Sequence, residues 1–166
     1  MSILVDILLL QTVSIAIASA GVFLAAVYYI FQLRHQAKVR QTDLVIRLYS
    51  HFSTKELQEA YFALRTLDFV DYDDFMKKYR MPAKSVVQLW QIGKFFDGVG
   101  TLLHRKLVDI GLVDDLFHTE AKLAWEKTKP IAEGRRIELK EPTIYQWFEY
   151  LYNELEKREQ RGVKNG

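Results

Sequence analysis

Residues 12–31 read TVSIAIASAGVFLAAVYYIF, and no charged side chain occurs among them. Twenty residues of α-helix rise about 30 Å, which is the thickness of the hydrocarbon core of a bilayer. The apolar stretch just before them leaves open a start near Ile7, although Asp6 and Gln11 argue against its lying at the bilayer centre. We therefore predict a transmembrane helix over residues 12–31, preceded by a short extracytoplasmic N-terminus of residues 1–11.

Two other interpretations of this stretch are less consistent with the sequence. The tripeptide ASA at Ala18–Ala20 is typical of a signal-peptide cleavage site, but no basic residue precedes the apolar run and about eleven further apolar residues follow the cut. A buried helix of a soluble protein is disfavoured by the length of the run and its lack of charge. The prediction is an uncleaved anchor.

The residues around the end of this run predict its orientation. Tyr28 and Tyr29 lie near that end, where aromatic rings with a polar tip favour the membrane interface. Arg34, Lys38 and Arg40 follow closely and nothing basic precedes the span, so the positive-inside rule places the C-terminal part in the cytoplasm. Each of these cations can also gain about 1 kcal/mol from anionic lipid headgroups. We expect a single-pass protein of the cell membrane that contacts the bilayer.

Small residues recur four apart within the span, a spacing that lets two helix backbones approach closely. The pairs are Ser14 and Ala18, Ala16 and Ala20, and Gly21 and Ala25. Self-association to a homo-oligomer is therefore one of the expected interactions, beside a protein partner.

Beyond the span, residues 32–53 are predicted to continue the same helix. One face of this juxtamembrane segment consists of residues three and four apart: Val39, Thr42, Val45, Leu48, Tyr49 and Phe52. This periodicity indicates one helix whose membrane half anchors the chain and whose cytoplasmic half packs into a bundle.

The rest of the chain has helix signals and no strand pattern. STKE at Ser53–Glu56 and TIYQ at Thr143–Gln146 match the capping box that opens a helix, and Pro142 suits a first helical turn. The fold class is therefore all-α, with one transmembrane helix continuing into a cytoplasmic bundle of about five helices over residues 54–157. Residues 158–166 form a basic, flexible tail.

A helix over roughly residues 83–104 is apolar on almost every side, as a central helix would be. Gly93, Gly98 and Gly100 each cost it about 1 kcal/mol relative to Ala. We expect either close contact with another helix or a break near Gly98. In the helix that follows, Pro130 predicts a bend or a division.

Composition excludes several functional classes. The 166 residues suffice for one domain, and the absence of Cys removes disulfides, thiolate metal sites and cysteine nucleophiles. A net charge of +2 is low for a nucleic-acid binder, and the aromatic residues fall on core stripes, so no nucleic acid is expected. Known zinc, nucleophile and phosphate-loop motifs are missing from the sequence. We predict no catalytic, cofactor-binding or metal-binding residue and no cofactor.

The sharpest acidic cluster is Asp71, Asp73 and Asp74. Carboxylates at this spacing can hold Mg²⁺ or Ca²⁺, but the glycine and terminal glutamate of a calcium loop do not follow. Basic residues come next in the chain, beginning at Lys77, which favours the interpretation of these acids as the N-terminal charges of one short helix.

Four stretches together resemble a known family. They are KVRQTDLVIRLYSHFSTKELQEAY, LWQIGKFFDGVGTLLHRKLVDIGLVDDLF, AWEKTKPIAEGRR and WFEYLYNEL. Their order resembles the family catalogued as domain of unknown function 4760, which contains membrane-anchored helical proteins of archaea and bacteria. The resemblance covers the chain from about Lys38 to Leu155. It implies an anchored helical fold, and it implies no activity and no catalytic residue.

The leading hypothesis is a non-enzymatic, membrane-tethered helical domain that binds a protein partner or serves as an accessory or signalling subunit. The alternative is a membrane-bound enzyme, metal-dependent through Asp71, Asp73 and Asp74. An exposed aromatic groove on the bundle would favour the binding hypothesis.

Overall fold

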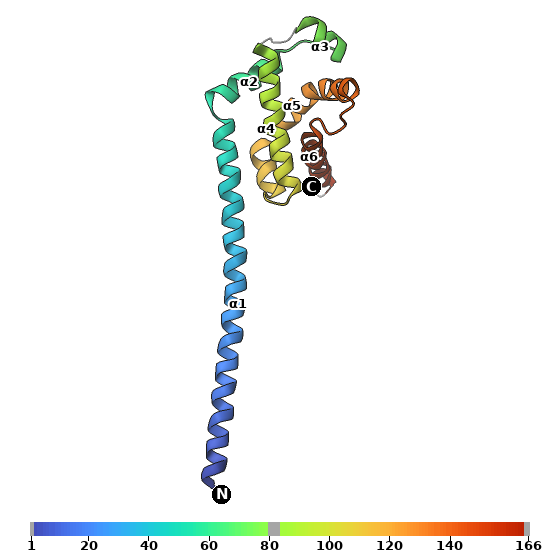
Figure 1. Cartoon of the computed structure of the whole chain (residues 1–166). Helices are drawn as coiled ribbons and strands as arrows, with labels where there is room; N and C mark the ends of the chain where they lie inside the picture. The colour runs from blue at the N-terminus through green and yellow to red at the C-terminus, as the bar shows by residue number, and fades with distance from the viewer. Residues whose placement is uncertain (1, 80–83, 165–166) are drawn as a thin grey trace. The chain divides into compact units, whose positions relative to one another are not determined.

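The computed structural model describes residues 2–79 and 84–164, and all regular structure within them is α-helical. The predicted all-α class is confirmed for this part of the chain. Its six helices (Figure 1) are α1 (Ser2–Phe52), α2 (Lys55–Thr66), α3 (Tyr72–Lys78), α4 (Lys84–His104), α5 (Ile110–Leu139) and α6 (Gln146–Lys164). The chain divides into two compact units, Met1–Arg40 and Gln41–Gly166.

The first unit consists of the greater part of α1. Within the described residues, α1 is the one helix whose length and composition would allow it to cross a membrane. Polar side chains in its apolar run bond to the helix itself, since the hydroxyls of Thr12 and Ser14 donate to backbone carbonyls one turn earlier. Such local bonds leave few polar groups unsatisfied in an apolar environment.

The second unit is a bundle in which α4 packs against α2, α5 and α6, while α3 packs on α5. This arrangement confirms α4 as the central helix (Figure 1). The predicted start at residue 83 lies outside the described residues, and α4 is described from Lys84. The largest fully buried side chains include Phe96, Phe117, Phe148, Leu64, Leu89, Ile92, Ile131, Leu151 and Leu155.

The last turns of α1 belong to this core. Val45 and Phe52 are 1% and 4% exposed. The ring of Phe52 lies 5.2 Å from that of Phe95 and 5.8 Å from that of Phe117, which brings α1, α4 and α5 together. Burying one phenylalanine contributes on the order of 2–3 kcal/mol, so this residue alone is a strong attachment for the end of α1.

Two of the three α4 glycines mark close helix contacts. A Cβ at Gly100 would lie 1.9 Å from the carbonyl oxygen of Trp147 in α6, and a Cβ at Gly93 would lie 2.7 Å from the ring of Tyr145. A Cβ at Gly98 would meet nothing within 4 Å, and α4 continues through this position. The expectation of close contact is confirmed, and the alternative of a break near Gly98 is wrong.

The predicted capping box at Ser53–Glu56 is wrong. The backbone and hydroxyl of Ser53 both donate to the carbonyl of Tyr49, at 2.9 and 2.8 Å, so this residue completes the end of α1. The N-cap of α2 is Thr54, and its side chain makes no capping bond. The serine is used by the preceding helix and is unavailable to the next one.

The predicted capping box at Thr143–Gln146 is also wrong. The Thr143 hydroxyl donates to Glu141, and α6 begins only at Gln146. The amides of the second and third residues of α6, Trp147 and Phe148, instead donate to Oδ1 of Asp97 in α4, both at 3.0 Å. Burial raises the pKa of Asp97 despite these two bonds.

Pro130 does not divide its helix, because α5 runs from Ile110 to Leu139 with the proline inside it. The Asp109 carboxylate caps its start by accepting from the amides of Gly111 and Leu112. At the other end of the chain, α6 continues to Lys164, so most of the segment that the sequence assigns to a tail is helical here.

The glycine contacts predict opposite effects for two substitutions in the same helix. Gly100→Ala should lower the free energy of unfolding by about 3 kcal/mol or more, because backbone atoms of α6 occupy the space of the new methyl group. Gly98→Ala should raise it by about 0.5 to 1 kcal/mol through helix propensity. Urea unfolding of the full chain in detergent micelles measures both, and equal effects of the two substitutions would contradict the close α4–α6 contact.

Candidate functional site

Two open hollows lie in a row along the seam between α2 and α5, and we call them together the α2–α5 groove. The first, about 510 Å³, lies between the end of α1, α2 and α5. The second, about 420 Å³, lies between the end of α2, the loop after it and α5. Arg65 and Leu123 line both hollows, so the two form one continuous surface feature.

One face of α5 forms the floor of this groove. Its residues recur at helical spacing: Leu116, Thr119, Glu120, Leu123, Glu126, Lys127 and Pro130. The residues that α5 contributes to the core lie on another face, and they include Phe117, Ala121 and Ala124. Over about four turns, α5 therefore has a face that the rest of the bundle leaves open.

The groove walls expose large apolar side chains. Phe62 of α2 is 58% exposed and Tyr49 of α1 is 45% exposed, while Val70 in the loop after α2 is 84% exposed. The buried face of α2 consists of Leu57, Ala60, Tyr61 and Leu64. Phe62 lies off that stripe, which is the sequence signal that marks it as a surface residue. Apolar residues gathered in this way are typical of interaction surfaces.

Charges are placed along the groove with a cation at its middle. The guanidinium of Arg65 lies 5.9 Å from the centroid of the Tyr61 ring, and the structure gives it no carboxylate partner among the described residues. Glu120 and Glu126 line the hollows on either side and, within the same part of the chain, form no ion pair. The remaining cation, Lys127, donates to the carbonyl of Leu67 at 3.0 Å. The groove thus presents a central positive charge with a glutamate on either side, and the second hollow also holds the positive charge of Lys127 beside Glu126.

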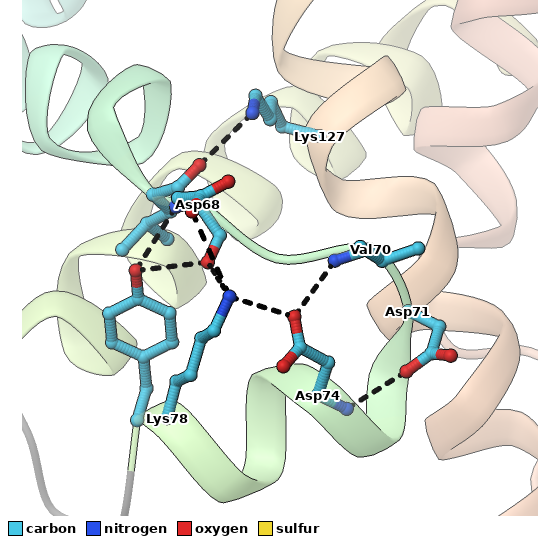
Figure 2. A network of polar contacts seen from close by, with 8 residues as sticks. Asp68, Val70, Asp71, Asp74, Lys78 and Lys127 are labelled. Atoms are coloured by element: carbon cyan, nitrogen blue, oxygen red, sulfur yellow. Dashed lines mark hydrogen bonds and ion pairs between the residues drawn. The ribbon is translucent and has the colours of Figure 1, made fainter.

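The acidic cluster is organised around backbone amides (Figure 2). Asp71 is the N-cap of α3 and accepts from the amide of Asp74 at 2.8 Å. Asp74 accepts from the amide of Val70 at 3.1 Å and pairs with Lys78 at 3.0 Å, contacts that lower the pKa of Asp74, with the Lys78 bond as the largest cause. These bonds confirm the interpretation of the cluster as the N-terminal charges of a short helix.

No three His, Asp or Glu side chains among the described residues converge closely enough to hold a metal ion. His118 illustrates how these groups are used, because its Nδ1 lies 2.6 Å from Asp114, one turn earlier in α5. Asp114 also accepts from Arg158 of α6 at 2.7 Å. The histidine therefore belongs to a polar contact that joins two helices.

The five residues predicted for the membrane interface all lie on α1. Tyr28 and Tyr29 are 67% and 62% exposed. Arg34, Lys38 and Arg40 follow within the next helical turns and are exposed as well. Their role at a bilayer stays a prediction.

The described residues define a class of protein in which a helical bundle follows a candidate membrane-spanning helix. Within that class, the family model described as "Domain of unknown function (DUF4760)" matches residues 15–155. The chain belongs to this family, which confirms the resemblance predicted from its sequence. No curated protein and no solved structure matches the chain.

Two substitutions in the acidic cluster distinguish a helix-capping role from a metal-binding role. Asp71→Ala should lower the free energy of unfolding by about 1 kcal/mol, because it removes the N-cap of α3. Asp73→Ala is the matched control and should change stability by less than about 0.5 kcal/mol. Urea unfolding measures both effects. Stabilisation by millimolar Mg²⁺ or Ca²⁺ that either substitution abolishes would contradict the capping role and support a metal site.

Proposed function

We propose that this protein is a membrane-tethered helical domain, placed on the cytoplasmic side, that binds an amphipathic helix of a partner protein in the α2–α5 groove. The observation that carries the proposal is the groove itself, in which Phe62 and Val70 are largely exposed beside an open face of α5. Exposed aromatic surface of this kind favours binding over a purely structural role.

The tether rests on α1. This helix carries an apolar run long enough to span a bilayer, with tyrosines and then basic residues at its end. The distribution of Arg34, Lys38 and Arg40 supports a cytoplasmic location of the bundle, because the positive-inside rule associates basic flanking residues with that side. A domain held at the membrane meets other membrane proteins at a raised effective concentration, so a modest intrinsic affinity is sufficient for binding.

The dimensions of the groove fit a helix. Leu116, Leu123 and Pro130 lie seven residues apart on α5, and the stretch between the first and the last rises about 21 Å. A partner helix of about 14 residues matches this length. It would place apolar side chains at positions i, i+3 or i+4, and i+7 over the two hollows, as helices bound in grooves do.

The charges of the groove specify the polar part of the partner. Arg65, which has no carboxylate partner among the described residues, calls for an acidic residue near the middle of the bound helix. Glu120 favours a basic residue toward one end of the bound helix, while Glu126 and Lys127 present both signs of charge to its other end. Such complementarity contributes to the choice of partner and to the association rate more than to affinity.

The alternative of a metal-dependent membrane enzyme has less support. It needs Asp71, Asp73 and Asp74 to direct their carboxylates at a common ligand. Two of these carboxylates are bonded to backbone amides of α3 and its approach, and one of them is also paired with Lys78.

A photo-crosslinking residue at position 62 tests the proposal in intact cells that express the full chain. We expect one discrete adduct with another protein at Phe62 and none when the probe replaces Ile137, which is 79% exposed and lines no part of the groove. Arg65→Glu should reduce the adduct about tenfold, because it reverses the central charge. Identical adducts at both positions, no adduct at Phe62, or an adduct between two copies of this chain would each overturn the proposal.

A further inference from the structure

A third hollow lies on a different part of the bundle, between α4, the end of α5 and the turn before α6. We call it the Tyr145 cleft, and its volume is about 410 Å³. Its lining residues are Trp90, Lys94, Asp97, Arg135, Thr143, Ile144 and Tyr145. A hollow of this size is within the range of small-molecule sites, which combine apolar walls with a few convergent polar groups.

Tyr145 is held in place by a strained backbone. Its φ of 54° lies in the left-handed region, which is unfavourable for a residue with a side chain and persists only where the surroundings enforce it. Its ring packs closely against Gly93, where an added Cβ would lie 2.7 Å from the ring. The side chain of Arg136 donates to the carbonyl of the preceding Ile144 at 2.9 Å and fixes the turn. Burial raises the pKa of Tyr145 to about 12, so its hydroxyl remains a donor at neutral pH.

The charges in the cleft leave an excess of positive charge. Asp97 is compensated, because its Oδ1 accepts from the two amides that open α6. Its Oδ2 accepts no hydrogen bond from the residues that the structure describes. Lys94 has no ion-pair partner within those residues, and Arg135 lies 5.0 Å from the centroid of the Trp90 ring without forming an ion pair in the same part of the chain. Two cations and a phenol thus face the cleft beside one free carboxylate oxygen.

We propose that the Tyr145 cleft binds a small phosphomonoester that also carries a hydroxyl group. Lys94 and Arg135 would contact the phosphate, since a dianion suits a pair of cations and arginine offers several donors to its oxygens. The Tyr145 hydroxyl would donate to a further phosphate oxygen. The hydroxyl of the ligand would donate to Oδ2 of Asp97. A soluble metabolite and a lipid headgroup share this chemistry, and the site lies apart from the α2–α5 groove.

Isothermal titration of glycerol 3-phosphate into the full chain, held in nanodiscs of neutral phosphatidylcholine, tests the proposal. We expect saturable binding with one site per chain. Lys94→Ala and Tyr145→Phe should each weaken it about tenfold, since each removes a hydrogen bond to a charged group. Tyr145→Phe keeps the ring against Gly93 and so preserves the turn. Lys129→Ala is the matched control on α5, with a side chain that is 53% exposed, and should bind as the wild type does.

The source of the ligand is distinguished by a second set of nanodiscs that contains phosphatidylinositol 4-phosphate, a lipid whose headgroup carries both a phosphomonoester and free hydroxyl groups. Loss of glycerol 3-phosphate binding in these nanodiscs assigns the cleft to a lipid headgroup, and unchanged binding assigns it to a soluble ligand. Absence of saturable binding in the neutral nanodiscs would overturn the proposal. So would equal affinities of the wild type, Lys94→Ala and Tyr145→Phe.

Discussion

The contact between α4 and α6 is the interaction on which the rest of the bundle depends. Asp97 of α4 accepts hydrogen bonds from the amides of the second and third residues of α6, and Gly100 one turn later lets the Trp147 carbonyl approach the helix backbone. A carboxylate at a helix N-terminus satisfies orphan amides and complements the helix dipole. Because this contact fixes where α6 begins, it also fixes the turn that holds Tyr145 in its left-handed conformation.

Phe52 joins α1 to the bundle core. It is the last residue of α1, the helix that carries the candidate span, and its ring is buried among Tyr61 of α2, Phe95 of α4 and Phe117 of α5. The residue therefore attaches the C-terminal end of α1 to the bundle core. The same junction borders the α2–α5 groove, since both Tyr49 and Phe52 line its first hollow. A protein bound in that groove would contact the C-terminal end of α1 directly.

The helical spacing of apolar residues predicted which helix faces are buried, because that spacing is local to each stretch of the sequence. The burial of Val45 and Phe52 at the end of α1 and the central position of α4 both follow from the spacing of apolar residues, and both are present. Both predicted capping boxes are wrong, because a local motif does not show which other groups compete for the same hydrogen bonds. The Ser53 hydroxyl bonds to the end of α1, and α6 is capped by Asp97, some fifty residues earlier in the chain. The groove depends on which face of α5 the other helices leave uncovered, and no single stretch of sequence contains that information.

The central claim is that α1 tethers the bundle to the cytoplasmic face of a membrane, and single-cysteine labelling tests it most directly. The chain has no native cysteine, so Ile3→Cys and Lys55→Cys each introduce one exposed thiol, before and after the apolar run. With a membrane-impermeant maleimide, the account predicts labelling at position 3 in intact cells and labelling at position 55 only after permeabilisation. Labelling of position 55 in intact cells would contradict it.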